Sequence, residues 1–237
     1  MRIAHLLAAC AVITAAASPA SAATRNFTIT GFEQVRVEGP FRVTLTTGVP
    51  PRASATGAQG ALDRIAIDVV GRTLVIHSDI SAWGEQSQSD DAGPVDIQIG
   101  THDLTAAALT GSGLLQIDKV TALSFTASVQ GSGMIGMGKA DVDQLSVNLT
   151  GGGSATVGGR AGTLTVSALG TSVFDGAALA TKDATITAQG PTTVKAAVSN
   201  SATIQASGPA TVTLTGNPAC TTRAGGSASV TGCRASQ

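Results

Sequence analysis

Acidic side chains in the C-terminal half of the chain have the types and spacing best suited to catalysis. Asp141 and Asp143 stand two residues apart, so on an extended strand both carboxylates lie on one side. Clustered carboxylates serve many polysaccharide lyases and hydrolases. The other aspartates of this region, Asp118, Asp175 and Asp183, stand at different offsets from the nearest glycine turn and do not extend the pair. Solvated charges at strand edges explain them more simply, so we predict no catalytic residue.

Histidines and cysteines give no metal or cofactor signature. His77 and His102 have no cysteine or second histidine beside them, and no histidine follows His102. No serine stands in a nucleophile-elbow motif with a histidine downstream. The glycine-serine turns lack the helix and lysine that follow a phosphate loop. We therefore expect no cofactor and no metal.

Hydroxyl side chains recur five residues before successive glycine turns, and they form the candidate binding face. A flat row of hydroxyls could bind a carbohydrate or a protein, or ice, as in some β-helical proteins. Ice binding would need a second hydroxyl column, but the column three residues before each glycine is mixed. A solvated face of good strand formers is the simpler interpretation. The candidate face consists of Thr126, Ser146, Thr165, Thr185, Thr203 and Thr221.

A polar stretch at residues 81–94 carries the only tryptophan, Trp83. The stretch is acidic and has no periodicity, which indicates a surface loop. Trp83 is a candidate ligand platform, and a cover for the loop base or for one end of the core is the structural alternative.

The elements that position these residues repeat with a fixed period. Glycine turns begin at residues 111, 131, 151, 170, 190, 208 and 226, giving spacings of 20, 20, 19, 20, 18 and 18. Positions two, four and six before each glycine are mostly apolar, as are positions four and six after it. Such a period predicts stacked coils that bury a shared narrow core, with glycine at a tight corner of each coil.

The predicted fold is therefore all-β, a single-stranded right-handed parallel β-helix with about 18–20 residues per coil. A left-handed helix has a similar coil length but needs an apolar residue every six positions, which this sequence lacks. Alternation at residues 27–45, 65–69, 73–76 and 95–99 predicts strands before the repeats. One domain, residues 23–237, then comprises N-terminal coils at 27–104 and regular repeats at 105–233.

The first 22 residues have the form of a signal peptide. A positive start, an apolar run at residues 3–17 and a small-residue site ending at Ala22 predict cleavage there, with Ala23 as the alternative. Cys10 resembles a lipobox cysteine, but it stands inside the apolar run. No later apolar run is long enough for a spanning helix. We expect an exported protein in the periplasm, on the outer surface or outside the cell.

Export leaves two cysteines, Cys220 and Cys233, in an oxidising compartment. We predict a disulfide that closes the last coil. Removing Arg2 changes the formal net charge from −1 to −2, which does not suggest a nucleic acid or an anionic membrane as a partner.

The sequence resembles the putative auto-transporter adhesin, head GIN domain family. The resemblance is carried by an opening that runs from Phe32 through Val35 to Val43, a strand at residues 73–76, and the first glycine turn, Leu109 to Gly113. It spans about residues 27–232 and implies a pectin-lyase-like β-helix, a role in cell adhesion and no recognised catalytic residue. We expect no translocator barrel from the sequence up to Gln237, so we do not expect the auto-transporter label to apply literally.

These observations favour a non-enzymatic exported interaction module for adhesion or cell-envelope binding, whose partner is a cell-surface carbohydrate or protein. The alternatives are a polysaccharide lyase or hydrolase on the same scaffold, and a structural envelope protein without a discrete ligand.

Overall fold

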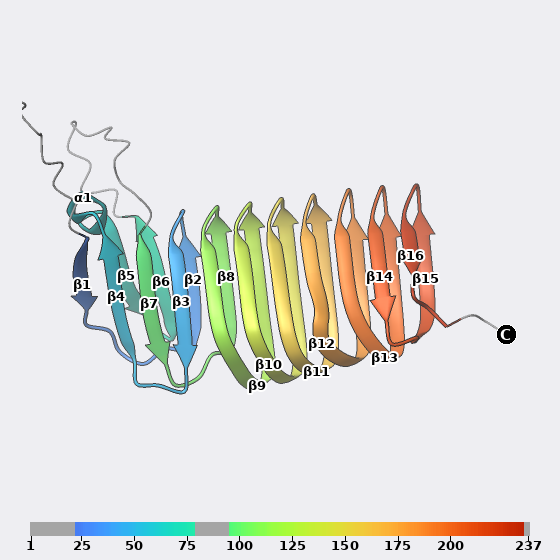
Figure 1. The fold of residues 1–237 in the computed structure, drawn as a ribbon, viewed down its shortest axis with the longest axis horizontal. Helices are drawn as coiled ribbons and strands as arrows, with labels where there is room; N and C mark the ends of the chain where they lie inside the picture. The colour runs from blue at the N-terminus through green and yellow to red at the C-terminus, as the bar shows by residue number, and fades with distance from the viewer. Residues whose placement is uncertain (1–21, 79–94, 235–237) are drawn as a thin grey trace, which may run out of the picture.

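The protein forms a parallel β-solenoid of about 6 turns (Figure 1). This architecture comes from a computed structural model that describes residues 22–78 and 95–234. The predicted fold class is confirmed. Most of residues 1–22, Cys10 among them, and the loop at 81–94 with Trp83 lie outside the described residues. No helix in the described ranges is long and apolar enough to cross a membrane.

Five long strands each wind through most of one coil. They are β9 (Leu114–Gly131), β10 (Met134–Gly151), β11 (Ser154–Gly170), β12 (Val173–Gln189) and β13 (Thr193–Ser207). Neighbours pair in parallel, and their register places each glycine turn beside the next, for example Gly131 beside Gly151. The next coil consists of β14 (Thr211–Thr215) and β15 (Ala219–Gly225), which both pair with β13, and β16 (Ser229–Thr231) begins a further coil beside β14.

Two edges divide each coil into two faces. We call the first edge the glycine corner: residues 111–113, 131–133, 151–153, 170–172, 190–192 and 208–210. We call the opposite edge the bend: residues 118–124, 138–144, 158–163, 177–183 and 197–201. Strand segments that precede the glycine corner form one face, and segments that follow it form the other. Figure 1 shows these flattened coils side by side along the long axis.

The N-terminal strands do not stack in chain order. β2 (Gln34–Glu38) and β3 (Arg42–Thr47) lie directly against β8 (Ala106–Gly111) and β9, although about sixty residues separate the two pairs in sequence. Gly39 has a φ of +128° and forms the first corner between β2 and β3. Figure 1 shows β2 and β3 (blue) between β8 and the strands that follow them in sequence.

The intervening segment closes the N-terminal end of the solenoid. β6 (Thr73–Ser78) and β7 (Asp96–Thr101) pair in parallel with β2 and β3, one on each face. Beyond them β5 (Ile65–Val70), β4 (Arg52–Gly57) and β1 (Ala23–Phe27) pair in antiparallel orientation. The short helix α1 (Gln59–Leu62) buries Ala61 and Leu62 at this end. This end is therefore closed by reversed strands and a helix, which differs from a simple stack of coils.

The core has the predicted columns. From β2 to β14 the inward positions are mostly apolar and almost fully buried, and their small size fits the narrow space between the two faces. In the last coil the prediction is wrong, because Thr222 and Ala224 of β15, which stand in the predicted inward columns, are exposed at an end that no further described coil covers. Phe174 fills the space beside Gly176, where a β-carbon would stand 2.8 Å from the ring atom Cε1. The glycine two residues after Phe174 therefore makes room for the ring, as the sequence indicated.

Candidate functional site

The predicted hydroxyl column is continuous in the structure. Each member pairs in register with the next, from Thr126 beside Ser146 to Thr203 beside Thr221. Neighbours on adjacent parallel strands are about 4.8 Å apart. All six side chains are half-buried or exposed, because their inward neighbours fill the core. We call the outward side of these strand segments the hydroxyl face.

The hydroxyl face is uncharged over most of its length. Its second column, in register, is Ser128, Asn148, Ser167, Thr187, Gln205 and Arg223. Between residues 126 and 207, all of which are described, the hydroxyl face carries no charged side chain. Arg223 is the first charged residue on this face after β8. The face therefore presents hydroxyl and amide groups that both donate and accept hydrogen bonds.

Charged side chains gather at the bend instead. Residues 114–201 contain ten of them, and eight lie at the bend. The two exceptions, Asp175 and Lys195, are register neighbours on the face opposite the hydroxyl face. The eight bend residues are Asp118, Lys119, Lys139, Asp141, Asp143, Arg160, Lys182 and Asp183.

Coil length also varies at the bend. Pairing is continuous where the strands approach the glycine corner, whereas register shifts occur between Met137 and Ala140, between Thr156 and Gly159, and within 176–183. The later coils have 18 residues rather than 20 because they are shorter here. Unequal coils leave a step along the edge.

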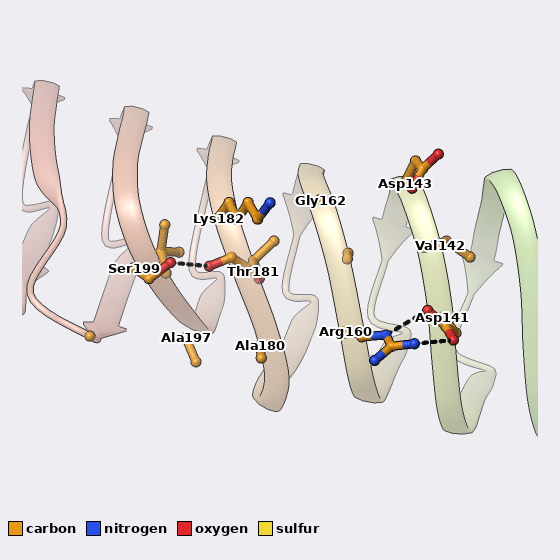
Figure 2. A pocket seen from close by; sticks show the side chains of 13 residues that line it. Asp141, Val142, Asp143, Arg160, Gly162, Ala180, Thr181, Lys182, Ala197 and Ser199 are labelled. Carbon is orange, nitrogen blue, oxygen red and sulfur yellow. Dashed lines mark hydrogen bonds and ion pairs between the residues drawn. The ribbon is translucent and has the colours of Figure 1, made fainter.

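This step forms an open groove with a volume of about 470 Å³, which we call the bend groove (Figure 2). It crosses coils from β10 to the turn after β14. Its floor is small and apolar, because the inward residues Val142, Ala161 and Val198 are buried beneath it. The full lining is Asp141, Val142, Asp143, Arg160, Ala161, Gly162, Ala180, Thr181, Lys182, Ala197, Val198, Ser199 and Gly216.

Asp141 and Arg160 form an ion pair on one rim of the bend groove. The Nε and Nη2 atoms of Arg160 donate hydrogen bonds of 2.7 Å each to the two carboxylate oxygens of Asp141 (Figure 2). These hydrogen bonds are the main reason that the pKa of Asp141 lies below its ordinary value. Desolvation opposes them, and attraction to Arg160 and Lys139 lowers the pKa further. The same contacts raise the pKa of Arg160. Asp141 is therefore ionised at neutral pH.

Asp143 and Lys182 lie on the other rim. Register places Gly162 between them, since Val142 pairs with Ala161 and Ala161 pairs with Thr181. Figure 2 shows the coil of Gly162 running between the two side chains. Both Asp143 and Lys182 are exposed. The rim thus has a negative group, a gap without a side chain, and a positive group.

The remaining aspartates have structural partners. Asp118 accepts a hydrogen bond of 3.0 Å from the backbone N–H of Thr47. Asp183 accepts hydrogen bonds from Ser201 and Asn200, and these lower its pKa in that order of importance. Asp175 accepts a hydrogen bond from the backbone N–H of Ala177. These contacts hold bends and adjacent coils together.

The structure unites Asp141 and Asp143 in one groove and leaves the other predicted chemical residues apart. His77 is on β6 and His102 follows β7, both outside the groove. Within the part of the chain that the structure describes, no three histidine, cysteine or acidic residues lie close enough to hold a metal. The sequence interpretation missed Arg160 and Lys182. Aligning the bends would have shown Lys182 two coils after Asp143 in one column.

Cys220 and Cys233 form the predicted disulfide, with an S–S distance of 2.06 Å. The bond joins β15 to the residues after β16, so it closes the last coil.

The profile of the family described as "Putative auto-transporter adhesin, head GIN domain" matches residues 31–218. None of the curated proteins matches the chain. A putative adhesin from Bacteroides fragilis is 16% identical, with a TM-score of 0.71 over 89% of this chain and 95% of that one. A putative lipid binding protein from Parabacteroides distasonis is 17% identical, with a TM-score of 0.68 over 90% and 96%. A putative adhesin from Parabacteroides merdae is 13% identical, with a TM-score of 0.68 over 90% and 96%. These structures share the fold.

Proposed function

Because the chain belongs to the putative auto-transporter adhesin, head GIN domain family, we propose that it is an exported, non-catalytic adhesin-like module. It binds a cell-surface carbohydrate or protein, or a component of the cell envelope, through the hydroxyl face. The observation that carries this proposal is the in-register column from Thr126 to Thr221, which presents hydroxyl groups over six coils.

The geometry of the hydroxyl face suits a repetitive polar ligand. Coils fixed by backbone pairing hold the hydroxyls at a constant spacing, so little conformational entropy is lost when a ligand binds. Uncharged donors and acceptors match the hydroxyl groups of a glycan or the polar edge of a protein. A ligand that lies along the solenoid axis would contact several coils at once, which adds weak contacts into useful affinity.

Export is supported by two independent features. Residues 1–22 have the pattern of a signal peptide. The Cys220–Cys233 disulfide suits an oxidising compartment such as the periplasm or the cell surface.

A non-catalytic role is supported by the electrostatics of Asp141, one of the two carboxylates that line the bend groove. A glycosidase needs one carboxylic acid that stays protonated, which requires a raised pKa. The pKa of Asp141 is lowered instead, and Arg160 occupies both of its oxygens. Polysaccharide turnover by the purified protein that disappears in Asp141→Asn or Asp143→Asn would overturn this part of the proposal.

Glycan-array and pull-down binding of the purified protein tests the hydroxyl face. Thr165→Arg and Thr185→Arg place bulky charges in the middle of the column, and we expect them to reduce binding at least tenfold, by steric exclusion. Thr213→Arg is the matched control, because Thr213 is an outward residue of the opposite face. Equal binding by all three variants would exclude the hydroxyl face as the binding site.

Trp83→Ala tests the other candidate binding residue in the same assays. Empty arrays and pull-downs would favour a structural envelope protein without a ligand.

The bend groove favours a second candidate function, lipid binding. One structural neighbour carries the name putative lipid binding protein, and the apolar floor of the bend groove offers a place for an acyl chain. Vesicle flotation and binding of monomeric lysophospholipids would test this function. If the protein binds neither vesicles nor lysophospholipids, lipid binding is rejected, and the proposal for the hydroxyl face is unaffected.

A further inference from the structure

We propose that the bend groove selects a phospholipid whose headgroup carries a primary ammonium next to its phosphate, of the ethanolamine type. Asp143 accepts the ammonium, Lys182 binds the phosphate, and the acyl chain lies over the uncharged end of the groove. This inference rests on the second candidate function, lipid binding, and adds the headgroup to it.

The spacing of Asp143 and Lys182 fits a short dipolar group. Their positions stand two coils apart with Gly162 between them, which is about 10 Å at the usual distance between strands. The two side chains and one hydrogen bond at each end take up much of that distance. What remains suits a phosphate and an ammonium joined by two carbon atoms. Gly162 leaves the path between them free of a side chain.

The other two charged residues that line the groove, Asp141 and Arg160, are paired with each other, and Asp183 beside the groove accepts hydrogen bonds. Arg160 gives two hydrogen bonds to Asp141, so this pair contributes little net charge to the opposite rim. Asp183 follows Lys182 and attracts it, but its Oδ1 already accepts hydrogen bonds from Asn200 and Ser201. Lys139 lies near Asp141 and favours its ionised form. Asp143 and Lys182 therefore remain as the opposite charges able to bind a zwitterion.

The groove is also polarised along its length. The two aspartates lie at the β10 end, and the two cations lie on β11 and β12. The part beyond them is lined by Ala197, Val198, Ser199 and Gly216, which carry no charge. A headgroup with its ammonium toward β10 would therefore direct its acyl chain toward β14, over small apolar side chains.

The lining favours a primary ammonium over choline. Quaternary ammonium groups cannot donate hydrogen bonds and are usually held by aromatic side chains. The described residues that line the bend groove include no aromatic. A primary ammonium can donate directly to the Asp143 carboxylate, and such charge-assisted hydrogen bonds are the stronger kind.

Isothermal titration with three lysophospholipids of one acyl chain, below their micelle concentrations, tests the headgroup. The probes carry ethanolamine, choline or glycerol next to the phosphate. We expect the ethanolamine form to bind about tenfold more tightly than the other two, the size of one hydrogen bond to a charged group. Equal affinity for the three would overturn the headgroup assignment while lipid binding survives. No binding of any probe would reject both.

Charge variants test the two named residues. Lys182→Glu and Asp143→Lys are each expected to weaken ethanolamine binding about tenfold and to abolish the preference over choline. Lys195→Glu and Asp96→Lys make the same charge changes at exposed positions outside the groove, and they should retain the preference. Circular dichroism will show whether each variant folds. A preference that persists in both groove variants, or that is lost equally in the two controls, would overturn the roles of Asp143 and Lys182.

Discussion

The glycine corner and the bend are the two edges of the same coils, yet they follow opposite rules. At the glycine corner every coil repeats glycine with positive φ, as at Gly131 and Gly151, and pairing with the neighbouring coils is direct. At the bend the coils differ in length, shift register and carry eight of the ten charges of residues 114–201.

The difference has a physical origin. The glycine corner brings backbone against backbone, and a β-carbon on Gly151 would stand 2.8 Å from the carbonyl oxygen of Gly131. Backbone also lies close to backbone at parts of the bend, as at Gly162, where a β-carbon would stand 2.7 Å from the carbonyl oxygen of Asp143. The register nevertheless shifts at the bend, so residues are added or removed there without breaking the ladders of either face. Surface segments with this freedom are where binding residues usually accumulate. The stacking of coils is therefore controlled at one edge, and variation in chemistry is permitted at the other.

Substitution at the glycine corner should give the largest loss of stability. Gly151 has a φ of +104° and no room for a β-carbon, so we expect Gly151→Val to lower the free energy of unfolding by about 4 kcal/mol. Gly152 has ordinary backbone angles, and serine stands at the same position in the two preceding corners, Ser112 and Ser132. Gly152→Ser should be nearly neutral in denaturant unfolding. If Gly151→Val lowered the free energy of unfolding only slightly, the glycine corner would not control the stacking of coils as we infer.

Reduction of the Cys220–Cys233 disulfide should give the second-largest loss of stability. The bond spans 13 residues, and the chain-entropy estimate for such a loop is about 3 kcal/mol. We expect reducing agent to lower the melting temperature, with hydrogen exchange increasing first in β15 and β16. Cys220→Ser/Cys233→Ser should melt like the reduced protein and be insensitive to reductant. An unchanged melt after verified reduction would contradict the closing role of this bond.

Overpacking the core next to the bend, at Gly176, should lower the stability by a smaller amount. Gly176→Ala places a methyl group against the ring of Phe174, and we expect a loss of about 2 kcal/mol. Phe174→Leu should relieve this contact, so the double variant should be more stable than the sum of the two single losses predicts. Additive losses in thermal unfolding would show that the ring and the glycine are not coupled.

The bend should give the smallest change in stability. The pKa of Asp141 in the folded protein lies below its ordinary value of 3.8, mainly because of hydrogen bonds from Arg160. A lowered folded pKa stabilises the protein above the unfolded pKa, and the effect is lost as pH falls through the folded pKa. Arg160→Gln should therefore melt slightly lower than the wild type at pH 7, and the difference should shrink as the pH falls below 3.8 and through the folded pKa of Asp141. A difference that persists there would assign the effect to packing.

Much of the fold could be predicted because its determinants are local and repeated. The 18–20-residue period, the apolar columns and Gly176 beside Phe174 can all be identified by counting along the chain. The candidate site was harder to predict from the sequence than the fold. Asp141 and Asp143 are neighbours in sequence, but Arg160 and Lys182 reach the same groove only because coils of unequal length lie in a particular register.

The sequence by itself determined the solenoid, its glycine corner, the hydroxyl column and the cysteine pair, because each follows from spacing along one chain. The tertiary structure decided two features. It placed β2 and β3 against β8 and β9 and closed the N-terminal end with antiparallel strands, since the exposed strand edges there needed partners. It also opened the bend groove, whose shape depends on differences between coils and whose charges come from three of them.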